Sequence, residues 1–330
     1  MSILQVNSLS ELMSREYSPQ RWLVDKMIAE DGLTILSAAP ASFKTWLALD
    51  IALCVARGEK FLDTFATEQD NVLIIDEESG ERSLQERFRQ LGVQDDDLPI
   101  YYISRAGRKI DKAYLDDIQG TCMDKEIGLV IFDSLIRFHS QDENSSSEMS
   151  HVLEFFKKIN DMGLACLILH HNRKSGTYYN NNSTGEAMRG SGDILAACDI
   201  QISLTRKGKN VTISQSKNRY CEEIQPITVE FDSSGGKSGF RFLGREKSKT
   251  EWNELTKTAI LRYVNEHPGI NKRQLEQGFR DADNDVSASK VSALLEELIK
   301  EKSIVTMRGP KNAQQLFVAG SGGETLALIE

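Results

Sequence analysis

The feature that most constrains this chain is a loop of small residues between two apolar segments. The run from Leu33 to Leu36 is typical of a buried strand, and a second apolar run begins near Lys44, as expected of a helix. A loop that ends in Lys-Thr at such a junction binds phosphate, because backbone N–H groups, the helix N-terminus, the Lys charge and the Mg²⁺-binding Thr hydroxyl converge there. We therefore expect the following residues to surround a nucleotide phosphate: Ala39, Pro40, Ala41, Ser42, Phe43, Lys44, Thr45 and Trp46.

The same loop departs from the usual spacing. Ala38 and Phe43 stand where glycines are expected. A Cβ at Phe43 restricts the backbone φ angle and crowds the phosphate, so weakened nucleotide affinity or lost hydrolysis is the alternative outcome. An ordinary strand-to-helix turn with a chance Lys-Thr pair is the other interpretation of these residues.

Length and composition indicate a globular protein with room for a core and a second small domain, since the chain has 330 residues. The net charge of −9 excludes a generally basic nucleic-acid-binding surface, so DNA contacts must come from local patches. The five cysteines are scattered without a CxxC pair, which is typical of reduced thiols. No apolar run is long enough to span a bilayer and no signal segment is visible, so we expect a soluble, cytoplasmic protein without membrane contact.

Short apolar runs alternate with helical segments over the first half of the chain. The expected strands are 33–36, 71–76, 100–104, 128–132 and 164–169, and the expected helices begin near residues 44, 83, 114 and 150. This alternation predicts an α/β fold with a mostly parallel sheet and helices on both faces. Segments 199–204, 210–216 and 227–231 are expected as antiparallel strands that complete the sheet, with a hairpin turn at 233–236.

Acidic and imidazole side chains follow the ends of these strands. Asp133 closes one strand and is expected to help hold Mg²⁺, or else to cap a turn. Glu78 is the candidate for orienting and deprotonating an attacking water, with Glu77 as its rival. One of His170 and His171 is expected to face the γ-phosphate, because neighbours on a strand point to opposite faces; a structural histidine pair is the alternative.

Basic residues gather between Arg206 and Arg219 without an acidic one. Lys217 and Arg219 end a strand, where they could reach the phosphates of a neighbouring subunit. A cation supplied in this way accelerates phosphoryl transfer by orders of magnitude. A solvated basic face is the alternative.

The C-terminal part is expected to form a separate winged helix-turn-helix. Three helical segments, 252–267, 271–279 and 287–302, precede the strand pair 304–308 and 314–318. The expected organisation is a lead-in at 1–18, a core at 19–244, a linker at 245–251, the winged unit at 252–319 and a tail at 320–330.

At this point the chain resembles the RepA-like branch of the RecA/DnaB-type ATPases, which are plasmid and phage proteins related to a hexameric helicase. The resemblance covers roughly residues 19–219. It rests on the following motifs: Lys44-Thr45-Trp46-Leu47-Ala48-Leu49-Asp50, Asp76-Glu77-Glu78-Ser79 with Arg87, Phe132-Asp133-Ser134-Leu135, Glu143-Asn144, His170-His171-Asn172-Arg173-Lys174 and Arg189-Gly190-Ser191.

The resemblance implies a RecA-like core that uses ATP and Mg²⁺. Lys44 would bind phosphate, Thr45 and Asp133 the metal, and Glu78 would be the catalytic carboxylate. Of the two histidines, His171 would belong to the catalytic groups and His170 to the nucleotide contacts, and one of them would sense the γ-phosphate. Lys217 and Arg219 resemble the Lys-x-Arg pair that acts between subunits of a ring, which is expected to be a hexamer, and Arg189 would face a neighbour or DNA.

Three functions remain open from the sequence. The first is a ring-forming helicase or DNA-stimulated ATPase in replication of a plasmid, phage or similar element. The second is a nucleotide-responsive replication initiator or regulator without translocation, and the third is a helicase loader that binds other replication proteins. The residues expected at single-stranded DNA are Arg173, Lys174 and Arg189, and those expected at duplex DNA are Lys272, Arg273, Arg308 and Lys311. Acidic residues outnumber Lys and Arg from 250 to 330, so the winged unit lacks the overall basic charge that is typical of DNA-binding domains. Its partner therefore remains open between DNA and protein.

Overall fold

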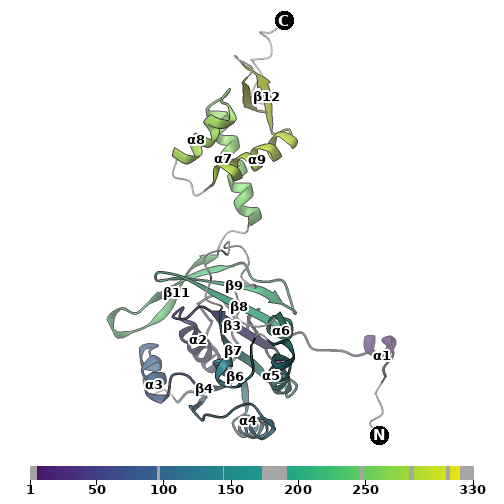
Figure 1. The fold of residues 1–330 in the computed structure, drawn as a ribbon, viewed down its shortest axis with the longest axis vertical. Coiled ribbons are helices and arrows are strands. Elements are labelled where there is room, and N and C mark those ends of the chain that lie inside the picture. The colour runs from purple at the N-terminus through teal and green to yellow at the C-terminus, as the bar shows by residue number, and fades with distance from the viewer. Residues whose placement is uncertain are drawn as a thin grey trace. The chain divides into compact units, whose positions relative to one another are not determined.

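The computed structural model describes residues 6–94, 97–143, 145–172, 192–245, 249–281, 286–309 and 313–319. The chain divides into two compact units, Met1–Glu246 and Lys247–Glu330 (Figure 1). The N-terminal unit opens with the short helix α1 (Leu9–Met13), which Ser8 and Glu11 cap reciprocally, and with the small strand pair β1 (Trp22–Val24) and β2 (Ile28–Ala29).

A large sheet forms the centre of the N-terminal unit. Within the described residues it has nine strands in the order β11-β10-β9-β8-β3-β7-β6-β4-β5. The strands are β3 (Leu33–Ala38), β4 (Asn71–Asp76), β5 (Ile100–Ser104), β6 (Ile127–Asp133), β7 (Ala165–His171), β8 (Ile200–Lys207), β9 (Asn210–Asn218), β10 (Ile227–Asp232) and β11 (Gly239–Arg245). Strands β8, β3, β7, β6, β4 and β5 run parallel, as the alternation of strands and helices predicts.

One strand direction differs from the prediction. The segment at 199–204 was expected to be antiparallel, but β8 runs parallel to β3, with Thr34 opposite Ile200 and Leu36 opposite Ile202. The helix α6 (Gly192–Ala197) precedes β8, so the chain returns to the same edge of the sheet before the strand begins, as in a crossover connection. The antiparallel part is β9, β10 and β11, and it starts at the short turn around Gly208.

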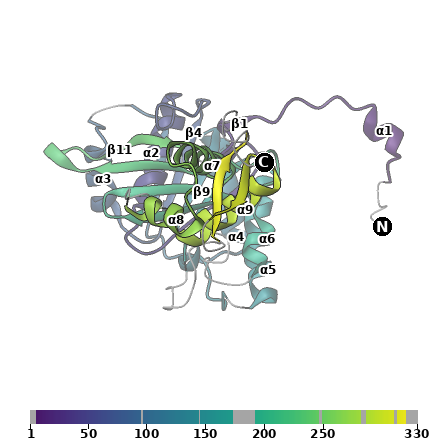
Figure 2. The same cartoon turned by 90° about the horizontal axis from the view of Figure 1, so that it is seen from above.

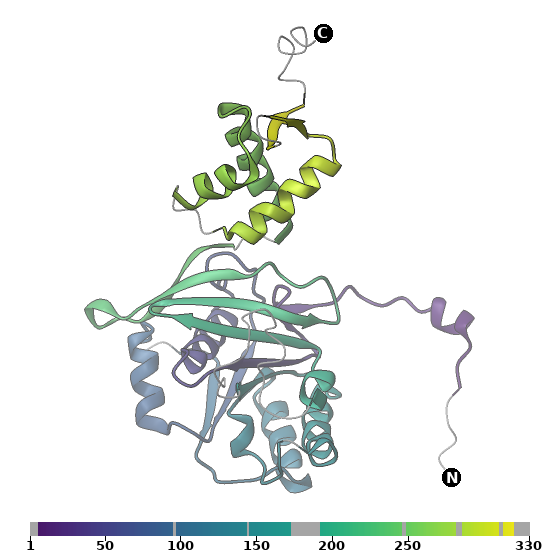
Figure 3. The same cartoon turned by 45° about the horizontal axis from the view of Figure 1, so that its top comes forward.

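Helices cover both faces of the sheet (Figures 1 and 3). One face packs on α2 (Lys44–Arg57) and α3 (Glu81–Gln90), and the other on α4 (Lys112–Asp124) and α5 (Ser146–Asn160). The short 3₁₀ turns are η1 (Leu135–Arg137) and η2 (Ser234–Gly236). Alternation along β3 directs Leu36 to the first core and Ile35 to the second. The sheet is therefore buried on both sides, which fixes the loops at its ends.

The helix after the loop, α2, is mostly apolar, and most of its side chains are buried. It ends at Gly58, whose φ of 69° provides the left-handed cap that is common after a helix C-terminus. The hairpin between β10 and β11 reaches α3, which Figure 2 shows beside β11, and the Ser238 N–H donates to the Gln90 carbonyl at 2.7 Å. The antiparallel strands thus pack along the side of the unit that carries α2 and α3.

The second unit contains α7 (Lys249–Glu266), α8 (Lys272–Asp281), α9 (Ala288–Lys300) and the antiparallel pair β12 (Ile304–Arg308) and β13 (Gln314–Val318). In α9 the residues Val291, Leu294, Leu295 and Leu298 form the buried stripe of an amphipathic helix. They pack with side chains of α7, α8 and both strands into a separate core. In the parts of the chain that the structure describes, no helix combines the length and the apolarity needed to cross a membrane.

The partly buried Asp50 on α2 provides a test of the packing around this helix. Burial, and secondly the charge of Asp63, raises the pKa of Asp50 to about 6, above the usual value near 4. The folded state therefore binds the proton more tightly than the unfolded state, and stability falls as pH rises from about 4 to 6. Asp50→Asn should raise the melting temperature at pH 7.5 but not at pH 4, as measured by calorimetry. The exposed Asp116 on α4 is the matched control, and an equal effect of Asp116→Asn would contradict the burial argument.

Candidate functional site

The residues predicted at strand ends meet at one edge of the parallel sheet. In the register of the sheet Asp76 lies opposite Asp133, Asp133 opposite Leu169, and Ala38 opposite His171. Ligands in such sheets bind at the carboxyl ends of the strands. A cleft of about 320 Å³ opens there. Its walls are Ala39, Ala41, Ser42, Phe43, Lys44, Thr45, Trp46, Glu78, Arg87, Asp133, His171 and Arg206.

The loop before α2 adopts left-handed backbone conformations without glycine. Ala41 has a φ of 59° and Phe43 a φ of 63°, and each such residue costs about 1–2 kcal/mol for an L-amino acid. The ring of Phe43 stacks on Phe231 of β10, with 4.1 Å between centroids and 24° between planes. The Arg206 guanidinium lies over the Phe43 ring at 4.0 Å and donates to the Ala41 carbonyl at 2.6 Å. Contacts from β8 and β10 therefore offset the strain of the loop.

Lys44 begins α2 and is almost fully buried. Its Nζ lies 3.2 Å from Nδ1 of His171. Burial lowers the pKa of Lys44, while the negative charges of Asp133 and Glu78 oppose this effect. The ammonium therefore points into the cleft beside two acids, where it can pair with an anionic ligand.

Thr45 and Asp133 form the second contact at the helix start. The Thr45 hydroxyl donates to Asp133 Oδ2 at 2.8 Å, while Asp133 Oδ1 is buried and accepts no hydrogen bond. Burial raises the pKa of Asp133 to about 6. A hydroxyl and a buried carboxylate oxygen without a donor are the oxygen ligands that Mg²⁺ prefers beside phosphate. Among the described residues there is no cluster of three or more His, Cys, Asp or Glu side chains arranged for a metal.

Glu78 faces this group from the end of β4. Its Oε2 accepts from the Ser134 hydroxyl at 2.8 Å and lies 3.7 Å from Nε2 of His171. The contact with His171, together with the Ser134 hydroxyl, lowers the pKa of Glu78 to about 2, although burial opposes this shift. The Asp76 carboxylate accepts the Glu78 and Ser79 N–H groups and fixes the turn.

The structure distinguishes the two pairs of neighbours that the sequence left open. The Glu77 carboxylate accepts from the Gly107 N–H at 3.0 Å, away from the cleft that Glu78 lines. His170 is buried on the other side of β7, with Nδ1 3.8 Å from Glu143 Oε1. Glu78 and His171 are therefore the members of each pair that face Lys44.

Lys217 and Arg219 do not lie in the cleft of their own chain. Gln201, near the start of β8, pairs with Lys217, which places both cations at the opposite end of the sheet. Lys217 Nζ donates to the carbonyl groups of Leu195 and Ala196 at 2.8 and 2.9 Å. Arg219 donates to Asp199 at 2.9 Å and to Ala196 at 2.7 Å. Both cations thus satisfy carbonyl groups at the end of α6.

The residues proposed for DNA fall into two groups. Lys272, Arg273 and Arg308 are exposed on the second unit, and Lys272 Nζ lies 3.4 Å from Glu296 Oε1. Arg173, Lys174, Arg189 and Lys311 lie outside the described residues.

The sequence did not assign Arg206, Phe231 or Ser134 to the site. Arg206 was visible only as one of several cations, and Ser134 only as a neighbour of Asp133. No local pattern connects Phe231 to a loop almost 190 positions earlier, since the contact arises from the order of the strands.

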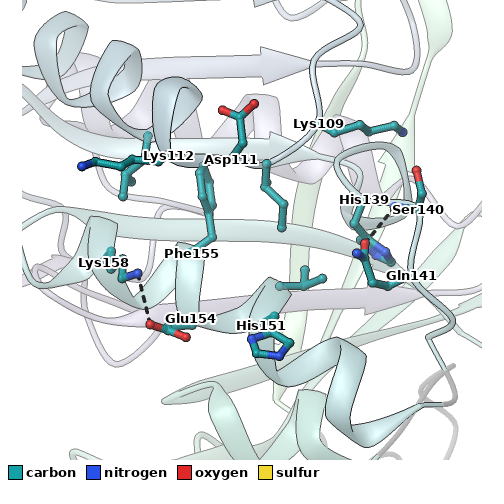
Figure 4. Close-up of a pocket in the computed structure, with 13 residues that line it drawn as sticks. Lys109, Asp111, Lys112, His139, Ser140, Gln141, His151, Glu154, Phe155 and Lys158 are labelled. Atoms are coloured by element: carbon teal, nitrogen blue, oxygen red, sulfur yellow. Dashed lines mark hydrogen bonds and ion pairs between the residues drawn. The ribbon is translucent and has the colours of Figure 1, made fainter.

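A second hollow, of about 410 Å³, lies between α4 and α5 (Figure 4). Two of its lysines are engaged: Lys158 pairs with Glu154 at 3.1 Å, and Lys109 donates to the Arg137 carbonyl at 2.5 Å. In Figure 4 Lys109 and Lys112 extend to opposite sides of the hollow. The combination of Lys, Thr and carboxylate groups is found in the loop cleft instead.

Comparison with known proteins agrees with this fold. A solved structure described as a DnaB-like replicative helicase and its interactions with primase matches with a TM-score of 0.54 at 14% identity, over 69% of this chain and 65% of that chain. The chain thus spans about two thirds of that protein's length, and at this identity the likeness shows the RecA-like fold alone. No curated protein matches the sequence. The family model described as an AAA domain, AAA_25, matches residues 4–177, more than half of the sequence, so the chain belongs to this family.

Proposed function

We propose that the chain is an ATP-dependent, DNA-acting protein: a RepA-like ring helicase or DNA-stimulated ATPase in replication of a plasmid, phage or other mobile element. The observation that carries the proposal is the meeting of Lys44, Thr45 and Asp133 with Glu78 and His171 in one cleft. The AAA family and the likeness in fold to a DnaB-like helicase support it.

In the proposed reaction Lys44 neutralises the β- and γ-phosphates that the loop N–H groups hold. Thr45 and Asp133 would hold Mg²⁺, which supplies charge neutralisation at the phosphate oxygens when bound. Glu78 stays ionised at neutral pH, so its carboxylate can accept a hydrogen bond from a water and orient it. To accept the proton of that water efficiently, its pKa must rise from about 2, which requires the contact with His171 to loosen when the nucleotide binds. His171 connects Lys44 with Glu78 and is therefore placed to respond to the γ-phosphate.

The loop itself favours a second candidate, a nucleotide-responsive regulator or loader without translocation. The Phe43 ring is held between Phe231 and Arg206, and Arg206 also binds the Ala41 carbonyl. A Cβ at Phe43 and a left-handed backbone without glycine crowd the phosphate, which favours weak or slow hydrolysis. The two candidates differ in whether DNA accelerates hydrolysis.

We propose that Lys217 and Arg219 act on the site of a neighbouring subunit. Both cations lie at the end of the sheet opposite their own cleft, and Arg219 is half-exposed. In a ring each subunit would present this end to the next cleft, and the site would be complete only between subunits.

We propose that the second unit is a winged helix-turn-helix with β12 and β13 as the wing. Its exposed cations Arg273 and Arg308 are candidates for duplex phosphates. Glu296 and Glu297 are exposed on α9, and their negative charges disfavour insertion of that helix face into the major groove of DNA. A protein partner is therefore the alternative for this unit.

Substitution of the catalytic groups tests the main proposal. Lys44→Ala should abolish Mg·ATP binding measured by calorimetry, because the buried cation is lost. Glu78→Gln should bind ATP but lower turnover by at least about a hundredfold, the scale of general-base catalysis. Glu77→Gln is the matched control and should keep most activity.

Wild-type turnover should rise with single-stranded DNA if the chain is a helicase or DNA-stimulated ATPase. A rate independent of DNA would favour the regulator or loader, and no Mg·ATP binding at millimolar ligand would overturn both.

Phe43 variants test the strain in the loop. Phe43→Ala and Phe43→Gly both remove the ring, but only glycine removes the penalty of the left-handed backbone. The Phe43→Gly chain should therefore be more stable than the Phe43→Ala chain by about 1 kcal/mol in urea unfolding. Equal stabilities would mean that the loop relaxes and carries no strain.

Mixing experiments test action between subunits. Arg219→Ala should bind ATP normally but lose at least about tenfold in turnover, while Arg241→Ala, at an exposed arginine on β11, should not. A mixture of Arg219→Ala and Lys44→Ala chains should recover activity, because some interfaces then combine an intact cleft with an intact arginine. No recovery in mixed assemblies, confirmed by light scattering, would place Arg219 outside the neighbouring site.

A further inference from the structure

The cleft at the loop continues into a second hollow. The cleft of about 320 Å³ and an adjoining hollow of about 520 Å³ share two wall residues, Trp46 and Arg87. Trp46 directly follows Thr45 in the first turn of α2. A nucleotide with its phosphates at Lys44 and Thr45 would therefore carry its remaining part past the indole of Trp46.

The indole is held in place by its neighbours. Trp46 packs on Phe231, with 5.3 Å between centroids and 54° between planes, and Phe231 is itself fixed by Phe43 and Phe240. The Arg87 guanidinium of α3 lies over the indole with Cζ 6.0 Å from the ring centroid. Arg87 Nη1 also donates to the Ser79 hydroxyl at 2.7 Å. The face of the Trp46 indole and the planar guanidinium of Arg87 thus lie opposite each other at the mouth of the cleft.

We propose that Trp46 and Arg87 form the stacking site for the nucleobase, between the indole and the guanidinium; this inference rests on the proposed nucleotide-binding function. Aromatic rings and Arg planes are the groups on which bases stack. A ring between them needs two contacts of about 3.5–4 Å, so the guanidinium must move outward by about 1–2 Å. Arg87 is only partly buried and has a long side chain, so this movement is open to it.

The walls of the hollow also determine which bases fit. Its other polar residues, Ser79, Arg82, Ser83, Glu86 and Gln90, are partly or fully exposed. Gln90 is already occupied: it donates to Glu86 at 2.8 Å and accepts from Ser238 at 3.1 Å. Strong discrimination needs buried polar groups that lose their partner when the wrong base binds. The site therefore accepts adenine and guanine alike and favours both over the smaller pyrimidines.

Affinities of the full chain for ATP, GTP, UTP and inorganic tripolyphosphate with Mg²⁺ test this site by calorimetry. ATP and GTP should bind within about threefold of each other and at least about tenfold more tightly than tripolyphosphate, since stacking contributes on this scale. Trp46→Ala should weaken ATP and GTP at least about fivefold and leave tripolyphosphate unchanged, while Trp46→Phe should keep most of the affinity. Arg87→Ala should weaken ATP, and Arg89→Ala, an exposed arginine on the same helix, should not.

Fluorescence gives a readout that does not need Trp46 to be replaced. The chain has three tryptophans, so Trp22→Phe with Trp252→Phe leaves only Trp46. Its emission should change with ATP or GTP and stay constant with tripolyphosphate.

Equal binding of ATP and tripolyphosphate by the wild type would overturn the stacking site and leave the proposed nucleotide function intact. A preference for ATP over GTP above about tenfold would overturn the tolerance argued from the exposed walls. An equal loss for ATP and tripolyphosphate in Trp46→Ala would show that Trp46 only supports the loop. Failure of every ligand to bind would overturn the nucleotide function and this site together.

Discussion

The backbone of the loop between β3 and α2 is the constraint on which the site depends. Ala41 and Phe43 both adopt left-handed conformations that usually belong to glycine. The strain persists because Phe43 is packed against Phe231 while Arg206 holds the Ala41 carbonyl. Strained backbone of this kind is kept only where the surrounding structure determines it. Strands β8 and β10, which carry Arg206 and Phe231, are therefore part of the site, although they carry none of the expected catalytic groups.

The parts of the site that depend on local sequence could be predicted, and the parts that depend on contacts between distant strands could not. The alternation of apolar runs and helices predicted the parallel sheet, and the ends of its strands placed Lys44, Asp133 and both open pairs, Glu77-Glu78 and His170-His171, at one edge. The structure has Lys44, Glu78, Asp133 and His171 around one cleft there. Such predictions need only local periodicity and the rule that parallel strands end together. The strand pair 304–308 and 314–318 was also confirmed, because a short turn between alternating segments is a local signal.

The parts that could not be predicted depend on distant contacts. The parallel direction of β8 follows from its pairing with β3, far earlier in the chain, and the packing of Phe231 on Phe43 follows from the strand order. Neither leaves a pattern in neighbouring residues. The choice between Glu77 and Glu78 could not be predicted either. Both residues follow the end of β4, where side chains no longer alternate between the two faces of the sheet, so their directions had to be seen in the structure.

The electrostatics of the cleft favour a ligand that brings a cation and an anion together. Asp133 and Glu78 act on the buried ammonium of Lys44, and Asp76 lies beside Asp133 on the neighbouring strand. Burial raises the pKa of Asp133, while contact with His171 lowers that of Glu78, so two nearby carboxylates are held in different protonation ranges. Buried carboxylate oxygens without donors are costly unless a cation or donor reaches them, and Asp76 and Asp133 each leave one such oxygen. A cation-bound phosphate would supply the missing charge to the acids and use the Lys44 ammonium at the same time. In the proposed function the position of Phe43 opposes this binding, because its Cβ and left-handed backbone crowd a phosphate at the loop.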